Sequence, residues 1–187
     1  MSVRIWFVRH GATQGNLERR YIGRTDEPLC TQGEEQMLRL RDALPGVDRL
    51  FVSPMLRTRQ SAALVYPDIS WTEEVRLREL DFGVFEGESA QNLQGNLQYE
   101  KWLESMCTGP IPGGENVVDF KKRCVDGFLS CVEQLPQETS CAFVVHGGVI
   151  MSILERLARP KRDYYSYHLP NGGYYQGVWE NGILTLE

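Results

Sequence analysis

Hydrophobic residues along the chain occur either in short continuous runs or at helical spacing. The runs at residues 5–8 and 141–145 are wholly apolar, which is typical of strands buried on both faces. Residues 117–132 instead place their apolar side chains about 3.6 positions apart, which predicts an amphipathic helix. The predicted series is strand 5–8, helix 31–44, strand 49–53, helix 54–66, strand 69–71, helix 117–132, strand 141–145, helix 149–159 and a hairpin of 174–179 with 183–186.

Two of the predicted helices begin at residues that are typical of helix N-termini. Thr31 stands three positions before Glu34, which is the spacing of a capping box. The next helix follows Ser53 and Pro54, which favours Ser53 as the N-cap with proline in the first turn. Both helices are therefore expected to start on a side-chain cap.

Strands and helices alternate along most of the chain, which predicts an α/β fold: a three-layer sandwich with a mostly parallel central sheet. The length of 187 residues suits one domain, and we expect residues 1–187 to form it. Residues 88–112 interrupt the alternation, and their apolar side chains recur at roughly helical intervals. This segment is predicted to be a helical insertion.

Composition excludes several classes of protein. Hydrophobic residues make up 42% of the chain and charged residues 24%, which is typical of a soluble globular protein. No window approaches the roughly 18 consecutive apolar residues that a membrane-spanning helix needs, and no signal-peptide pattern is present. The five cysteines are odd in number and include no Cys-x-x-Cys pair. We therefore expect reduced thiols, a cytoplasmic location and no membrane partner.

The charge distribution indicates the kind of ligand. A net charge of −5 argues against nucleic acid as a partner, because binding to a phosphate backbone needs a basic surface. Residues 1–60, however, contain ten arginines and only seven acidic residues. The planar fork of arginine matches a carboxylate or a phosphate. An acidic chain with an arginine-rich segment could therefore hold a small anionic ligand, and the alternative is arginines that merely lie on a solvated surface.

Two of the three histidines occupy matching contexts. His10 follows the run 5–8 after one arginine, His146 follows the run 141–145 directly, and each precedes a glycine. The carboxyl ends of parallel strands share one edge of a sheet, where ligands bind, so the two imidazoles are expected to meet there. The alternative is two histidines that only fill the core, and the repeated context makes it less favoured.

Several other chemistries find no support in the motifs. There is no His-x-x-x-His and no cluster of aspartates, which disfavours a metal site. Gly-x-Ser-x-Gly, Gly-x-Gly-x-x-Gly and Walker patterns are also missing from the sequence. An imidazole beside fixed arginines remains, and it suits a histidine that attacks phosphorus while cations hold the oxygens. The sequence therefore predicts phosphoryl transfer.

Several ordered blocks of the sequence resemble one family. The blocks are residues 9–16, 21–26, 29–33, 53–58, 78–83 and 145–148. They are similar to the signature of the histidine phosphatases, the superfamily that includes the cofactor-dependent phosphoglycerate mutases. Residues 82–87 and 112–116 look like its shorter phosphatase branch, which includes α-ribazole phosphatases and broad-specificity enzymes. The resemblance covers nearly the whole chain.

The resemblance implies catalytic roles for the matching residues. His10 would be the nucleophile and would pass through a phosphohistidine, with its ring held by the backbone carbonyl of Gly11. Arg9, Arg57 and His146 would hold the transferring phosphoryl group, whose charge is spread over three oxygens.

The resemblance also implies an acid and a set of substrate contacts. Glu79 would protonate the leaving alkoxide and later deprotonate the attacking water. Asn16, Gly23 and Gly147 would contact the substrate. The expected substrate is a small phosphomonoester, and the resemblance implies neither a metal ion nor a cofactor in the phosphatase branch.

Neighbouring residues serve as comparisons for these roles. Arg59 lies close to Arg57 in the sequence and is expected to point elsewhere. Glu79 lies among other glutamates, and only the family block distinguishes it from a solvated charge run. Asp81 stands where the mutases have a histidine, which leaves its role open. His168 is expected to be a loop residue rather than a ligand.

The sequence also bears on the choice between phosphatase and mutase. Mutases of the superfamily carry paired arginines after the general-acid block, whereas residues 88–107 here contain a single cation, Lys101. We therefore favour a phosphomonoesterase, with a mutase-type phosphotransferase as the alternative. A non-catalytic binder of phosphorylated ligands is less favoured, because it would need no acid. The candidates for lining a leaving-group pocket, with core packing as the alternative, are Phe85, Tyr99, Trp102, Tyr174 and Tyr175.

Overall fold

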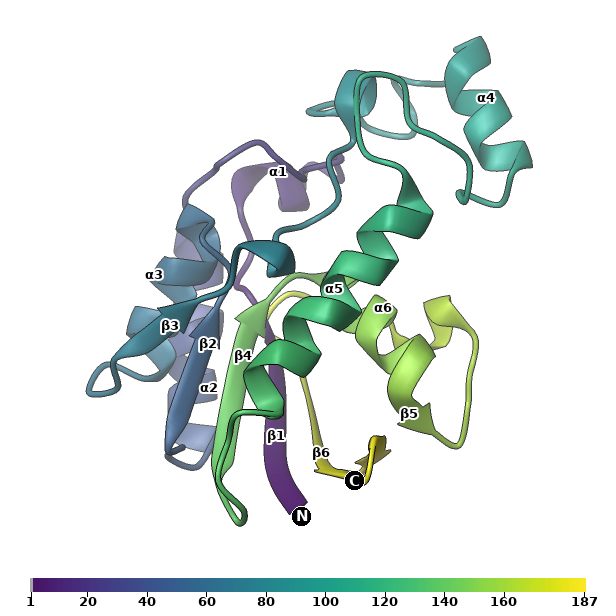
Figure 1. The fold of residues 1–187 in the computed structure, drawn as a ribbon. Coiled ribbons are helices and arrows are strands. Elements are labelled where there is room, and N and C mark those ends of the chain that lie inside the picture. Colours follow the sequence, from purple (N-terminus) through teal and green to yellow (C-terminus); the bar gives the residue numbers. More distant parts are fainter. Residues whose placement is uncertain (1) are drawn as a thin grey trace.

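A mixed seven-stranded sheet forms the centre of the computed structural model, which describes residues 2–187 (Figure 1). The strands are β1 (Ser2–Arg9), β2 (Arg49–Val52), β3 (Trp71–Glu73), β4 (Ser140–Val145), β5 (Ala158–Arg159), β6 (Tyr174–Glu180) and β7 (Ile183–Leu186). Their order across the sheet is β3-β2-β4-β1-β6-β7-β5. Four of the six neighbouring pairs are parallel, and only β6 is antiparallel to both of its neighbours. The predicted mostly parallel sheet is confirmed.

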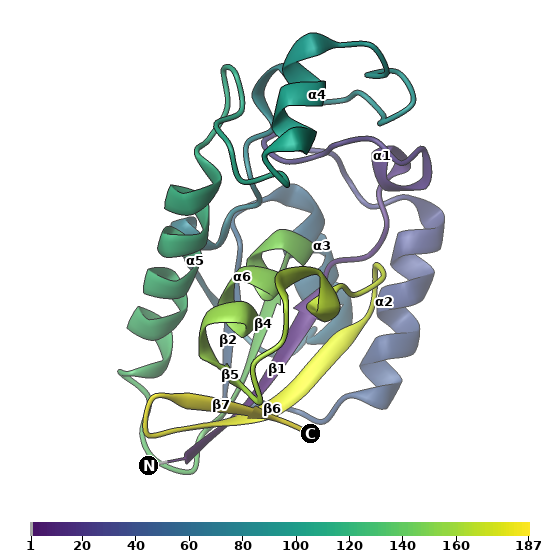
Figure 2. The ribbon, with the colours of Figure 1, turned by 90° about the vertical axis from the view of Figure 1, so that its right-hand side faces the viewer.

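Helices cover both faces of this sheet (Figures 1 and 2). The helices are α1 (Gln14–Leu17), α2 (Thr31–Ala43), α3 (Leu56–Val65), α4 (Leu97–Glu104), α5 (Val117–Val132) and α6 (Gly147–Leu157). Buried residues of α2 and α3 share one core cluster, and those of α5 and α6 share another. The fold is therefore the three-layer α/β sandwich that the sequence predicts.

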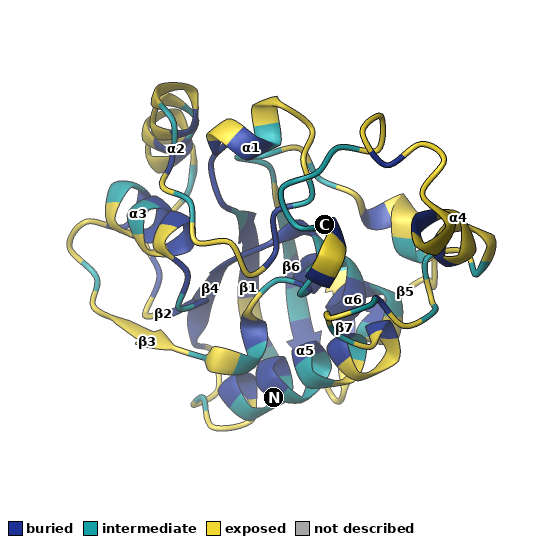
Figure 3. Ribbon diagram, turned by 90° about the horizontal axis from the view of Figure 1, so that it is seen from above, coloured by how far each residue is buried: buried dark blue, intermediate teal, exposed yellow. Residues whose placement is uncertain are grey.

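The side chains of β1 alternate between these two cores. Ile5 and Phe7 pack in the cluster beneath α5 and α6, whereas Trp6 and Val8 pack in the cluster beneath α2 and α3. A strand that is buried on both faces needs apolar residues at consecutive positions, which explains the continuous run in the sequence. The view from above shows β1 and β4 as the buried centre of the molecule (Figure 3).

The segment 88–112, where an insertion is predicted, contains the helix α4. The side chain of Asn96 caps this helix by accepting hydrogen bonds from the amides of Gln98 and Tyr99. Tyr99 and Trp102 form its buried side. Both ribbon views place α4 beyond the carboxyl ends of the central strands (Figures 1 and 2). The segment therefore stands over the sheet edge where the two histidines are expected.

The predicted capping box of α2 is wrong. The helix begins at Thr31 itself, and Cys30 is its N-cap without a side-chain hydrogen bond. The amide of Cys30 donates to the carbonyl of Ala12 at 3.0 Å. Gly33 in the first turn also lies directly against the backbone of Ala12. The contacts of Cys30 and Gly33 with Ala12 thus fix the start of α2 at Thr31, one residue earlier than the capping motif predicts.

The predicted cap of α3 is also wrong. Met55, not Ser53, precedes the first helical residue, Leu56, and it makes no side-chain cap. The carboxylate of Asp26 accepts the amide of Leu56 at 2.7 Å, so a distant loop satisfies the first turn. The strand predicted at 69–71 likewise lies two residues later, as β3 at the edge of the sheet.

The remaining sequence expectations concern membranes, metals and thiols. Among residues 2–187, no helix is long and apolar enough to cross a membrane. The same residues contain no group of three or more His, Cys, Asp or Glu side chains placed to hold a metal ion. All five cysteines are free thiols, as predicted, and three of them are buried in the core.

Candidate active site

The parallel pairing of β1 with β4 brings the two histidines together. Arg9 and Val145 are partners in the register of these strands, and His10 and His146 follow them directly. The centroids of the two imidazole rings lie 5.1 Å apart, with the rings nearly edge to face. Residues that are 136 positions apart in the sequence thus meet at one edge of the sheet.

His10 is held in a defined orientation. Its Nδ1 lies 2.7 Å from the carbonyl oxygen of Gly11, so Nδ1 carries the proton and donates it. Only 3% of the residue is exposed. Burial lowers the pKa of His10 well below its ordinary value, and the charges of Arg57 and Arg9 lower it further. The imidazole is therefore neutral, and its Nε2 keeps a free electron pair.

Two arginines accompany this imidazole, Arg57 buried and Arg9 half-buried. Arg57 is fully buried, and its two terminal nitrogens donate to the carbonyls of Thr25 and Gly23, each at 2.9 Å. Arg9 donates through Nη1 to the carbonyl of Leu169. Burial lowers the pKa of both guanidinium groups, although they remain strong bases and stay charged. Two cations at one buried place need an anion nearby.

Three nitrogens at this place have no hydrogen-bond partner among residues 2–187. They are Nε of Arg9, Nε of Arg57 and Nδ1 of His146. The other ring nitrogen of His146, Nε2, lies 2.7 Å from the hydroxyl of Ser53. A buried polar group without a partner costs about 1–3 kcal/mol. The arrangement therefore suits an anion with several acceptor oxygens better than it suits the protein alone.

Glu79 is the carboxylate whose charge acts most strongly on both of these cations. Its Oε2 accepts the amide of Gly148 at 3.0 Å, in the first turn of α6, and its Oε1 accepts the amide of Leu80 at 2.9 Å. Its negative charge acts on both Arg9 and Arg57, whose pKa values it raises against the effect of burial. A carboxylate at the N-terminus of a helix is stabilised by the helix dipole.

The neighbouring charged residues point elsewhere, as the sequence predicts. Arg59 is exposed and pairs with Glu73 through two hydrogen bonds of 2.7 and 2.9 Å. Glu74 pairs with Arg76, and Glu88 accepts from the side chain of Asn92. Glu79, by contrast, accepts a hydrogen bond from the first turn of α6, so it is distinct within its charged run.

Both the sequence and the fold match known proteins. The model of the histidine phosphatase superfamily (branch 1) matches residues 5–187. The chain belongs to this superfamily. Probable phosphoglycerate mutase GpmB of Salmonella typhi is 34% identical to this chain over an alignment of 155 residues that covers 78% of this chain and 70% of that protein.

Solved structures of the superfamily share the fold. A phosphoglycerate mutase from Thermus thermophilus superposes with a TM-score of 0.75 at 32% identity, covering 97% of this chain and 95% of that one. The α-ribazole phosphatase from Shigella flexneri superposes with a TM-score of 0.87 at 24% identity, covering 98% and 94%. The likeness to the second structure is a likeness of fold alone.

A cavity of about 830 Å³ lies beside the cations of this site. Four of the predicted site residues line it: Arg9, Asn16, Glu79 and Gly147. Of the other four, His10, Arg57 and His146 are buried outside this lining, and Gly23 lines a second, smaller cavity. The cavity therefore meets the buried site at the wall that contains Arg9 and Glu79.

The aromatic lining of this cavity differs from the prediction. Trp102 lines it, but Phe85 and Tyr99 are buried in the core, and Tyr174 and Tyr175 belong to β6, away from the lining. The aromatic residues that line it without having been predicted are Tyr21, Phe82, Phe120, Tyr164 and Tyr165. Tyr21 stacks edge to face on Trp102, with ring centroids 6.0 Å apart. Such a wall suits a flat, apolar group.

Two residues whose roles the sequence left open have defined places. His168 follows a short 3₁₀ helix in a loop, and its side chain lines the cavity, where burial and the charge of Arg9 lower its pKa. Asp81 accepts the amide of Gly83 at 2.8 Å and lies 3.4 Å from Arg24. Asp81 therefore organises a turn and lines a second, smaller cavity.

Supporting residues of the site carry no signal in the sequence. Asn171 donates from its side chain to that of Asn16 at 3.0 Å, which ties α1 to the loop before β6. The carboxylate of Glu86 accepts the amides of Gly23, Arg24 and Thr25, the residues whose segment holds Arg57. These contacts bridge segments far apart in the chain, so no local pattern could have indicated them.

Proposed function

We propose that this chain is a metal-independent phosphomonoesterase that works through a phosphohistidine on His10. The observation that carries the proposal is the neutral, buried imidazole, fixed through Nδ1 and lying within the electrostatic influence of the buried Arg57 and the half-buried Arg9. Its Nε2 would attack phosphorus while the bond to the leaving oxygen breaks. Arg9, Arg57 and His146 would bind the oxygens of the phosphoryl group through their unpartnered nitrogens.

Glu79 completes the proposed reaction. It lines the cavity and would give a proton to the leaving alkoxide. The resulting carboxylate would take a proton from water, whose oxygen attacks the phosphohistidine and releases inorganic phosphate with the free His10. Two backbone amides donate hydrogen bonds to Glu79, and they would hold its carboxyl group in one position during both steps.

The cavity supports a small substrate whose alcohol carries a ring. Trp102, Tyr21 and Phe120 contribute flat apolar walls. The two other cations of the lining are already paired, Lys121 with Glu155 at 2.7 Å and Arg20 with Glu18 at 2.6 Å. An α-ribazole phosphate or another ring-bearing phosphomonoester fits such a lining better than a compact dianion. The cytoplasmic location, the absence of a cofactor and the lack of nucleic-acid or membrane partners remain part of this proposal.

A phosphoglycerate mutase activity is the second candidate. It is favoured by sequence identity, because the relatives named as mutases are 32–34% identical to this chain and the α-ribazole phosphatase 24%. A mutase must hold the carboxylate of its substrate as well as the phosphate. The pairing of Arg20 and Lys121 with acidic side chains argues against such a second anion site.

The first test is phosphate release in the presence of EDTA. The substrates are an aryl phosphate, sugar phosphates, α-ribazole phosphate and 3-phosphoglycerate. Turnover in EDTA with a preference for a ring-bearing substrate supports the proposal. Isomerisation of 3-phosphoglycerate without net phosphate release would favour the mutase, and binding without any turnover would favour a non-catalytic phospholigand binder.

A variant tests the nucleophile. His10→Ala removes the attacking nitrogen and should lower phosphate release by about 10³-fold or more, as loss of a nucleophile does in other covalent mechanisms. Circular dichroism and the melting temperature check that the variant is folded. Arg59→Ala is the matched control at a surface ion pair and should keep full activity. Near-normal turnover in a folded His10→Ala protein would contradict the proposal.

A further inference from the structure

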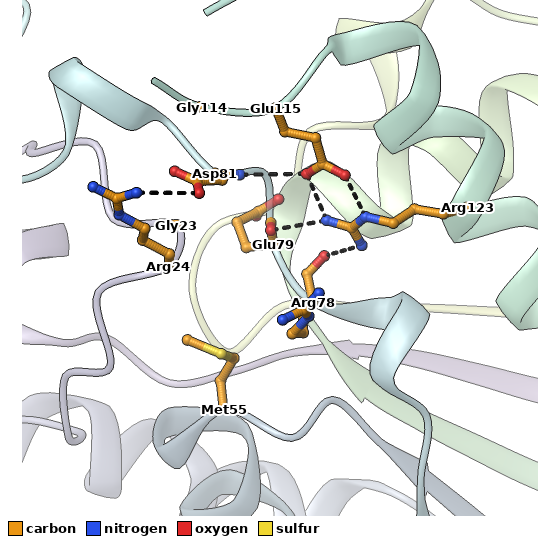
Figure 4. A pocket seen from close by; sticks show the side chains of 9 residues that line it. All are labelled: Gly23, Arg24, Met55, Arg78, Glu79, Asp81, Gly114, Glu115 and Arg123. Carbon is orange, nitrogen blue, oxygen red and sulfur yellow. Dashed lines mark hydrogen bonds and ion pairs between the residues drawn. The ribbon is translucent and has the colours of Figure 1, made fainter. Parts of the chain in front are cut away.

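The segment that carries Glu79 has no regular secondary structure. It lies between the 3₁₀ helices η1 (Val75–Leu77) and η2 (Gly83–Phe85), so its carbonyls have no helix or sheet partners of their own. Arg123, from the middle of α5, supplies those partners. Its guanidinium donates to the carbonyl of Arg76 at 2.6 Å and to the carbonyls of Arg78 and Glu79 at 2.7 and 3.1 Å. Figure 4 shows the contacts with Arg78 and Glu79.

All the donors of this guanidinium are used. The two remaining N–H groups of Arg123, on Nε and Nη2, bind the two carboxylate oxygens of Glu115 at 2.5 and 2.8 Å. An arginine side chain has five N–H donors in a fixed fork, and each has an acceptor here. The guanidinium also lies over the ring of Phe120, 4.8 Å from its centroid. No other side chain could meet all of these contacts at once.

Glu115 holds the same segment on the far side of Glu79. Its amide donates to the carbonyl of Asp81 at 3.0 Å, and its carboxylate lies 3.5 Å from the amide of Asp81. Arg123 and Glu115 together therefore hold the backbone before, at and after Glu79. Figure 4 shows this network around Glu79, with Glu115 and Arg123 joined by two dashed lines.

Arg123 does not face the large cavity. It lines the smaller cavity of about 310 Å³, which Glu79 also lines, whereas only Glu79 of the pair lines the large one. A substrate in the large cavity would thus contact the carboxylate of Glu79 and not the guanidinium. Any effect of Arg123 on catalysis has to pass through the segment that it holds.

We propose that Arg123, with Glu115, is the positioning pair of the general acid: it fixes the backbone from which Glu79 reaches the leaving oxygen. This inference rests on the proposed phosphomonoesterase function. Proton transfer requires heavy-atom distances of about 2.6–3.2 Å, and a misplacement of about 1 Å can cost 100-fold in rate. Loss of the fork should therefore impair protonation of the leaving group while the nucleophile and the phosphate site persist.

The test compares two substrates with opposite needs for an acid. An aryl phosphate has a good leaving group and needs little protonation, whereas an alkyl phosphate such as glycerol phosphate needs it fully. Arg123→Lys keeps the charge and loses the fork, and Glu115→Gln weakens the pair from its other side. Both should lose about tenfold or more in kcat on the alkyl phosphate and less than about threefold on the aryl phosphate. Arg59→Lys, at the exposed bidentate pair with Glu73, is the matched control and should change neither rate.

A second background shows whether the effect passes through Glu79. In Glu79→Gln, which has no acid to position, Arg123→Lys should cause no further loss on either substrate. Equal losses on the two substrates, or a full additional loss in the Glu79→Gln background, would overturn the positioning role and leave the phosphatase proposal intact. A wild-type protein that hydrolyses neither substrate would overturn both, and retained melting temperatures distinguish all of these results from unfolding.

Discussion

Replacing Glu86 with glutamine removes an acceptor on which two loops of the site converge. One carboxylate oxygen accepts the amides of Gly23, Arg24 and Phe82 at 3.1, 2.9 and 3.0 Å. The other accepts the amide and hydroxyl of Thr25 at 3.3 and 2.7 Å. Glutamine must turn its NH₂ group toward one of these sets, so at least two charge-assisted hydrogen bonds are lost. At about 1.5–3 kcal/mol each, and at the low end for a half-buried group, the loss is about 3 kcal/mol.

This loss has two measurable consequences. A protein of this size loses about 2–4 °C in melting temperature per kcal/mol, so Glu86→Gln should melt about 6–12 °C lower in a thermal scan. Its kcat should fall as well, because the loop from Gly23 to Thr25 accepts the hydrogen bonds of Arg57. Glu88→Gln, two residues further on with an exposed contact to Asn92, is the control. If both variants melt within about 2 °C of the wild type, Glu86 does not organise the site.

Three further predictions concern packing, ring orientation and pH. In Gly23→Ala the new Cβ would lie 1.7 Å from the carbonyl oxygen of Leu80, so unfolding experiments should reveal a loss of about 3 kcal/mol, and a wild-type stability would contradict the close approach. Ser53→Ala removes the hydroxyl that orients His146 and should lower kcat about tenfold, as measured by steady-state kinetics; an unchanged kcat would exclude that role. Burial lowers the pKa values of His10 and His146, so below pH 6.5 these two imidazoles bind protons in the unfolded chain but not in the folded one. Stability should therefore fall from pH 7 to pH 5, by up to about 1.4 kcal/mol per histidine and pH unit, and less steeply in His146→Gln; an equal slope would contradict this.

Some features of the site could be predicted from the sequence because they depend only on the local order of strands and helices. His10 and His146 each follow an apolar run, and the ends of parallel strands lie at one edge, so their meeting needs no knowledge of side-chain packing. The separation of Arg57 from Arg59 follows from helical geometry, since two positions turn a side chain to the other face. Local spacing was sufficient in both cases.

The remaining features depend on contacts between distant segments. Arg123 binds the carbonyl of Glu79 from 44 positions away, and nothing in the pattern of its helix distinguishes it from a solvated arginine. The two predicted side-chain caps were wrong for the same reason. The amide of Cys30 binds the backbone of Ala12, and the amide of Leu56 binds the side chain of Asp26, so remote loops fix the starts of these helices. Phe85 and Trp102 both pack in the core, but only Trp102 also lines the cavity. Their neighbours in the fold decide this difference, and the periodicity of the sequence does not specify those neighbours.

The place of β1 in the sheet has a consequence for how the chain folds during synthesis. β1 is synthesised before the other strands of this sheet, yet its neighbours are β4 and β6, which lie in the second half of the sequence. Until β4 has been synthesised, the apolar run from Ile5 to Val8 lacks this neighbouring strand and can form non-native contacts. Closing so long a loop delays folding, because its entropy must be paid before the contacts form. An incomplete chain that ends before Val145 therefore carries His10 and Arg57 but cannot assemble the place where they act.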